Sequence, residues 1–113
     1  PISELGQFAG EYADTASAVL DSIVIVSDTD HVVAVSGVKK SEYMDRKIDT
    51  ELDRIIQSKN SVHDNHKAIV PILVHGDPIG SVTILPKANM QLTDTEFKAA
   101  EIGASFLGKQ VEH

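Results

Sequence analysis

The chain has 113 residues, a formal net charge of -7 and no cysteine. This length fits one domain with one hydrophobic core. The missing cysteine excludes disulfides, thiolate metal sites and thiol catalysis, and the acidic balance argues against direct contact with nucleic acid. No apolar run approaches the roughly 20 residues that span a bilayer, and no signal peptide opens the chain, so we expect a cytoplasmic protein that does not enter membranes.

The first segment of the chain has the apolar periodicity of a helix. Apolar residues recur at helical spacing over 2–20, which predicts a helix there. Two short runs rich in Val and Ile, 22–27 and 31–36, follow it. The polar residues 28–30 separate them, and this pattern predicts two antiparallel strands joined by a tight turn.

The middle of the chain carries the signals of two short helices. Ser41 is placed to cap a helix that reaches Met44 or Asp45. Asp49 or Thr50 is placed to cap a second helix, which ends at Asn60. The following stretch, 61–66, has little hydrophobicity, so we expect a mobile loop.

The strongest pattern lies in the second half of the chain. Two apolar runs, 68–74 and 81–85, flank a turn-like segment, 75–80, rich in Gly, Asp and Pro. The first run is apolar on both faces, which predicts a hairpin at the centre of a sheet that is covered on both sides. Beyond it, the capping box 93–96 predicts the start of a long helix that runs to about Val111.

The order helix, two strands, short helices, two strands, helix predicts an α+β fold in one domain, 1–113. Strands joined by hairpins form an antiparallel sheet. We expect the two terminal helices on one face of this sheet and the short helices on the other.

Several segments resemble a known family of sensing domains. They are 1–6, 11–13, 33–37 and 76–80, the last followed by Val82 and Ile84. In this order they resemble a GAF domain, whose fold is profilin- and PAS-like, and most of all the C-terminal GAF domain of SpoVT-type sporulation regulators in the AbrB group. The signature of cyclic-nucleotide GAF domains is absent, and 61–69 is shorter than the family leads us to expect.

The resemblance implies the regulatory and oligomerising domain of a bacterial transcription regulator, without enzymatic activity. It also implies that the chain is the C-terminal part of a longer protein, whose absent N-terminal domain contacts DNA. Two alternatives remain open: a stand-alone metabolite sensor of another signalling protein, and a small cysteine-independent enzyme on the same scaffold.

In GAF domains the ligand sits between the sheet and the short helices. Carried onto this chain, the candidate pocket residues are Ser36, Tyr43, Leu52, Ile69, Pro71, Leu73, Ser81 and Thr83. Period two puts Ser81 and Thr83 on one face of a strand, either towards an unidentified small molecule or at a partly exposed edge. The basic residues at 39–40 and 46–47 form either a solvated face or an anion site at the pocket mouth.

Other polar residues give no sign of a cofactor, a metal or catalysis. Metal sites need three or four converging ligands, and no spacing of the five histidines enforces that. Asp28, Asp30 and Asp77 are turn carboxylates, which usually cap their own backbone. We therefore assign no catalytic residue, no metal ligand and no cofactor.

The last helix has apolar residues on two sides. Phe97, Ala100, Ala104, Leu107 and Val111 form one stripe, and Ala99, Ile102 and Phe106 lie nearly opposite. The second stripe is covered either by the first helix of the same chain or by a second copy in a helical bundle. The candidate oligomer interface is Phe8, Tyr12, Ala99, Ile102 and Phe106.

Overall fold

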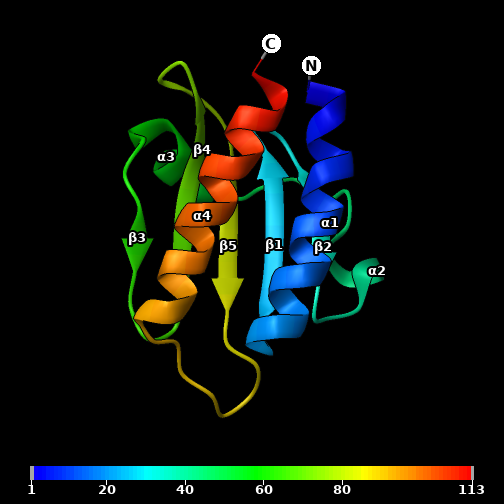
Figure 1. Ribbon diagram of the computed structural model, residues 1–113, viewed down its shortest axis with the longest axis vertical. Helices are drawn as coiled ribbons and strands as arrows, with labels where there is room; N and C mark the ends of the chain where they lie inside the picture. The colour runs from blue at the N-terminus through cyan, green and yellow to red at the C-terminus, as the bar shows by residue number, and fades with distance from the viewer. Residues whose placement is uncertain (1, 113) are drawn as a thin grey trace.

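The computed structural model describes residues 2–112, so Pro1, the first residue of the segments that resemble GAF domains, and His113 lie outside the described residues. The elements are α1 Ile2–Leu20, β1 Ile23–Asp28, β2 Val32–Ser36, α2 Lys40–Tyr43, α3 Thr50–Ser58, β3 Val62–His63, β4 Ala68–Val74, β5 Asp77–Leu85 and α4 Asp94–Val111 (Figure 1). Their order confirms the predicted one, with one strand added.

The five strands form one antiparallel sheet in the order β2-β1-β5-β4-β3. Strand β5 is central and pairs with β4, which confirms the predicted central hairpin. The turn is shorter than predicted, because only His75 and Gly76 lie outside the strands. Both have positive φ, 52° and 82°, and such two-residue turns match the twist of paired strands.

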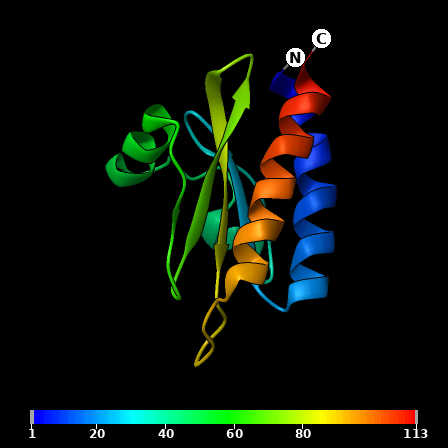
Figure 2. The same cartoon turned by 60° about the vertical axis from the view of Figure 1, so that its left-hand side comes forward.

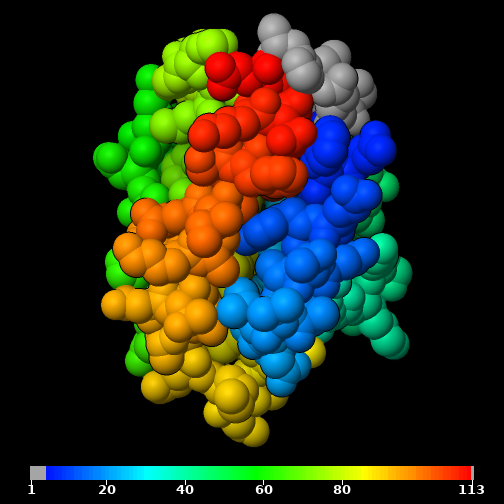
Figure 3. Space-filling view, in the orientation of Figure 1, coloured from blue at the N-terminus to red at the C-terminus, as the bar shows by residue number. Residues whose placement is uncertain are grey.

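The sheet is covered on both faces, as the α+β prediction requires. Helix α1 packs on β1 and β2, and α4 packs on β4 and β5, while α3 contacts β4 and β5 from the opposite face (Figure 2). In the space-filling view, α1 and α4 lie side by side and hide most of the sheet (Figure 3).

Small residues let α1 and α4 approach the sheet and each other. Ala9, Ala13, Ala100 and Ala104 belong to the main core. The ring of Tyr12 occupies the space where a side chain at Gly103 would lie. These close approaches explain why the buried faces of both helices are rich in Ala and Gly.

Capping residues set the starts of the two longer capped helices. At α4 the Thr93 backbone N–H donates to Glu96 Oε1 at 2.6 Å, which confirms the predicted capping box. At α3 the Leu52 N–H donates to Asp49 Oδ1 at 2.8 Å, so Asp49 is the cap. The prediction for Ser41 is wrong: α2 begins at Lys40, and its N-cap, Lys39, makes no side-chain hydrogen bond.

The segment 61–66 is not wholly a loop, which corrects the prediction. Val62 and His63 form β3 and pair with Ile69 and Ala68 at the start of β4. A turn follows, in which Asp64 Oδ1 accepts hydrogen bonds from the backbone N–H groups of His66 at 2.7 Å and Lys67 at 3.0 Å. The hydrogen bond from His66 is the main cause that lowers the pKa of the Asp64 carboxyl.

Tyr12 links the two terminal helices and yields a pH prediction. Its hydroxyl donates to the Ala99 carbonyl oxygen at 2.7 Å, and burial raises its pKa from 10.0 to about 12. Because the folded pKa is the higher one, the stabilisation is complete below pH 10 and is lost as the pH rises towards 12.

In a Tyr43→Phe variant, Tyr12 is the only tyrosine, so absorbance titration reports its phenol alone. We expect phenolate to form near pH 12 in the folded chain. Denaturation curves should show that the free energy of unfolding decreases between pH 10 and about pH 12. In a Tyr12→Phe variant this decrease should be smaller, because the phenol is absent. A phenol that titrates at its ordinary value would contradict the burial of Tyr12.

Candidate functional site

A hollow of about 330 Å³ lies between the sheet and the short helices. The side chains that line it, called the hollow below, are Ile25, Val32, Tyr43, Arg46, Lys47, Ile48, Asp49, Glu51, Leu52, Ile69 and Thr83. Its floor comes from three neighbouring strands, because Thr83 of β5 is in register with both Ile25 of β1 and Ile69 of β4. Residues in register on antiparallel strands point to the same face, so these three side chains form one row.

Four of the eight candidate pocket residues line this hollow. They are Tyr43, Leu52, Ile69 and Thr83. The strand residues Ile69 and Thr83 are placed there by the sheet register, and Tyr43 and Leu52 by the two short helices. The hollow therefore has an apolar floor with one hydroxyl group.

Ser36 is placed on the opposite face, which corrects the expectation for it. It pairs with Val24, whose side chain belongs to the core beneath α1. The strand partner of β2 shifts register between Val26 and Ser27, so the alternation of faces along β2 is interrupted. The resemblance placed Ser36 by the order of the elements, which does not show the face to which a residue of β2 points.

Pro71 and Leu73 line a different depression. It has a volume of about 340 Å³ and lies between β4 and α4, with Ala104 and Lys109 among its other residues. Strand β3 pairs only with the first two residues of β4, so this part of β4 lies at the edge of the sheet. The pairing with β5 also shifts register between Ile72 and Leu73, and the sequence of β4 alone shows neither this shift nor where the edge begins.

Ser81 is buried beside the hollow, but its hydroxyl is already engaged. Its Oγ lies 2.7 Å from Oγ of Ser27, the residue opposite it on β1. The pair satisfies two polar groups in an apolar sheet. Thr83 differs, since no hydrogen bond of its hydroxyl is found among residues 2–112. Thr83 is thus the hydroxyl group available at the floor.

The rim of the hollow carries both signs of charge. Arg46 and Lys47 lie there, as does the carboxylate pair Asp49 and Glu51, which we had not predicted. The guanidinium carbon of Arg46 lies 6.0 Å from the centre of the Tyr43 ring. Lys39 and Lys40 are not among the lining residues, so only half of the basic cluster is at the mouth.

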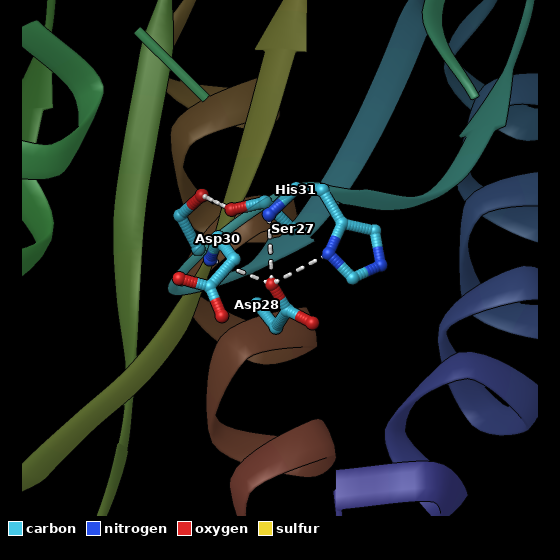
Figure 4. A network of polar contacts seen from close by, with 5 residues as sticks. Ser27, Asp28, Asp30 and His31 are labelled. Atoms are coloured by element: carbon cyan, nitrogen blue, oxygen red, sulfur yellow. Dashed lines mark hydrogen bonds and ion pairs between the residues drawn. The ribbon is translucent and has the colours of Figure 1, made fainter. Parts of the chain in front are cut away.

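The β1–β2 turn holds one side of this rim in place. Asp28 Oδ1 accepts hydrogen bonds from the backbone N–H groups of Asp30 at 2.7 Å and His31 at 2.8 Å (Figure 4). The adjacent backbone binds the rim segment, because Val32 N–H donates to the Arg46 carbonyl oxygen at 2.8 Å. Asp28 thus caps its own turn, as predicted, and backbone hydrogen bonds of Asp30 and Val32 hold the turn against 45–48.

Within residues 2–112, no three His, Asp or Glu side chains converge as ligands for a metal ion. No helix in that part of the chain combines the length and apolar character needed to cross a membrane.

The five candidate interface residues divide between covered and exposed positions. Tyr12 covers Ala99 through its hydrogen bond, and the rings of Phe8 and Phe106 meet edge to face with centroids 6.3 Å apart. Ile102 remains 69% exposed and Phe106 43% exposed. Helix α1 therefore covers only one side of the second apolar stripe.

Comparisons with known proteins agree with this architecture. Residues 4–112 match the family described as stage V sporulation protein T C-terminal, transcription factor. Stage V sporulation protein T of Bacillus subtilis (strain 168) is 37% identical over 128 residues, which covers 99% of this chain and 71% of the relative. This aligned stretch is longer than the chain itself, so the relative carries residues that this chain lacks.

Two solved structures share the fold. The cofactor-binding GAF domain of the nutrient sensor CodY from Clostridium difficile has a TM-score of 0.65 and 20% identity, covering 88% of this chain and 81% of that one. Type II free methionine-R-sulfoxide reductase from Thermoplasma acidophilum has a TM-score of 0.65 and 16% identity, covering 93% of each chain. At such identities the likeness shows the fold alone, which is that of a GAF domain.

Proposed function

Since this chain belongs to the family of stage V sporulation protein T C-terminal domains, and so is the regulatory domain of a SpoVT-type transcription regulator, we propose that it binds a small molecule in the hollow beneath α3. The single observation that carries this proposal is the row Ile25, Thr83 and Ile69, which places one hydroxyl group in an apolar floor. Ligand sites of this kind combine apolar walls with a few polar groups.

The chemistry of the lining restricts the molecule that fits. The floor offers aliphatic contact and one hydroxyl, and the rim offers both cationic and anionic groups. A small, mostly aliphatic molecule with a polar or charged end matches this arrangement. Its apolar part would lie on the floor and its polar end at the rim.

We propose a binding role without catalysis. The chain has no cysteine to act as a nucleophile, and the buried hydroxyl groups of Ser27 and Ser81 bind each other. The carboxylates of Asp49 and Glu51 lie on the exposed rim, away from the enclosed floor. General acid–base catalysis requires groups positioned on the reacting atoms, and no such set supports an enzyme here.

The charge of the domain supports the assignment of DNA contact and regulation to different parts of the regulator. A net charge of -7 repels the phosphate backbone, so we assign DNA contact to another part of the full-length protein. The domain described here would then act on DNA binding indirectly, through its ligand or its assembly.

A second copy of the chain is the partner that we propose for the exposed stripe of α4. Ile102 and Phe106 are large, apolar and exposed, and they lie on one face of the helix. Packing two such faces across a two-fold axis would remove both side chains from water. The covered neighbours, Phe8 and Tyr12 of α1, would border that contact.

A thermal-shift screen of small metabolites tests the proposed binding. A bound ligand raises the melting temperature by mass action, corresponding to about 2.7 kcal/mol at one hundred times its dissociation constant. Thr83→Val keeps the shape of the side chain and removes the hydroxyl, so it should reduce that rise strongly. Ser36→Ala, on the opposite face, is the matched control and should retain the full rise. A screen in which no metabolite raises the melting temperature would contradict the proposal.

A further inference from the structure

The residues 59–67 connect the two faces of the sheet, and we call them the strap. The strap begins at Lys59, the C-cap of α3, and contains β3. In Figure 1, β3 runs along the edge of the sheet from α3 towards the start of α4. There the ring of His63 stacks on Phe97 of α4, with centroids 3.8 Å apart and planes 12° from parallel.

A second attachment ties the strap to the segment that leads into α4. The Leu92 N–H donates to the Asn65 carbonyl oxygen at 2.9 Å, and the Leu92 side chain belongs to the main core. Asn65 itself belongs to the turn that Asp64 holds, directly before the start of β4. The strap is therefore fastened to the start of α4 by an aromatic stack and by a backbone hydrogen bond.

At its other end the strap follows α3, which contributes to the rim of the hollow. Ile56 anchors α3 on the sheet and is fully buried. Only residues 59–61 separate α3 from β3, and this link spans about 14 Å at most between Ser58 and Val62. A movement of α3 away from the sheet would thus pull directly on His63.

Strand β3 can separate from β4 more easily than the central strands can separate from each other. It has only two residues, and it is paired on one side alone. Short edge elements with few contacts open at low free-energy cost, well before the central strands. The strap can then shift while β4, β5 and the core stay in place.

We propose that the strap couples the hollow to α4: occupation of the hollow displaces α3, and the His63–Phe97 stack passes this displacement to the first turns of α4. A regulatory role for this coupling rests on the proposed ligand, whereas the contacts that transmit it are present in the chain without a ligand. The turns affected lead directly into the exposed residue Ile102. Ligand binding on one face would in this way alter the surface offered to a second copy on the other.

Hydrogen exchange on the 113-residue chain tests this coupling without any ligand. Ile56→Ala loosens α3, and we expect amides 98–100 of α4 to exchange about threefold to tenfold faster, the range that loss of one aromatic contact corresponds to. In a His63→Ala background, adding Ile56→Ala should leave these amides unchanged. His66 belongs to the same strap but makes no ring contact among the described residues. In a His66→Ala background the increase should therefore persist.

One control separates coupling from a general loss of stability. Ile25→Ala removes the same side-chain bulk from the floor of the hollow and leaves every residue of α3 unchanged, so it should not reproduce the increase at 98–100. If Ile56→Ala does not fold, Leu52→Ala, a half-buried residue of the same helix, replaces it.

Two results would overturn the coupling: an equal increase with Ile25→Ala, or an increase that persists in the His63→Ala background. Because no ligand is used, a failed metabolite screen leaves this result standing. Conversely, if a metabolite binds but the coupling test fails, the proposed coupling through the strap is refuted and the proposed binding is not.

Discussion

A Gly80→Ala variant should lose about 3 kcal/mol of unfolding free energy, a large overpacking effect for a single methyl group. Gly80 lies in the central strand β5, opposite Asp28 of β1. An added Cβ would overlap the Ser27 carbonyl oxygen and lie 3.1 Å from the Asp28 Cα. Both neighbours are backbone atoms of a buried strand, so neither can rotate away.

Urea denaturation followed by circular dichroism measures this loss as a lower midpoint at unchanged slope. Gly10→Ala in α1 is the matched control, because no atom lies within 4 Å of its added Cβ. Alanine is the better helix former, so this control should gain about 0.5–1 kcal/mol. Two variants of equal stability would show that the approach of β1 to β5 is looser than described.

Ile102→Glu and Phe106→Glu should each convert the proposed oligomer into a folded, smaller particle. Both side chains are exposed in a single copy, so a carboxylate there is solvated and should leave the fold intact. In the proposed contact the same carboxylate would be buried without a partner, which costs several kcal/mol. Light scattering reports the particle mass, and circular dichroism reports that the variant is folded.

Met90→Glu is the control for this pair. Met90 is 61% exposed, similar to Ile102, but it lies in the connector between β5 and α4. It should leave the particle mass unchanged. An unmutated chain that is already monomeric at micromolar concentration would refute the contact outright, and an oligomer that persists in both Glu variants would place its interface elsewhere.

The structure also makes the two proposals separable. The hollow lies on the α3 face of the sheet, and Ile102 and Phe106 lie on α4 on the other face. The substitutions in one therefore have no direct contact with the other, and effects of residues without shared partners usually add. Departures from additivity between Thr83→Val and Ile102→Glu would thus point to communication through the sheet or through the strap.

Local patterns in the sequence determined the long helices, the two hairpins and their arrangement in layers. The apolar periodicity marked α1 with the bounds that the structure has, and the capping box marked the start of α4. The apolar runs marked β4 and the centre of the sheet. These signals are local because helical periodicity, capping and turn chemistry each depend on residues a few positions apart.

Which residues face the hollow was decided by the tertiary structure. Period two shows that Ser81 and Thr83 share a face, but not that Ser27 lies opposite Ser81 and takes up its hydroxyl. The register shift beside Val26 reverses the assignment of Ser36, and the sequence carries no mark of it. Register and bulges depend on the partner strand, and a shift of one residue exchanges the two faces.

The strap is the segment whose structure could least be predicted from the sequence alone. Nothing in the polar segment 61–66 predicts a strand, because one of the contacts that hold the two residues of β3 is with a distant part of the chain. Val62 pairs with Ile69, and His63 stacks on Phe97, more than thirty positions away. The sequence by itself determined the helices, the central hairpin and the layers, since their signals are local. The tertiary structure decided the edge strand, the members of the hollow and the exposed face of α4, since each depends on which distant segments pack together.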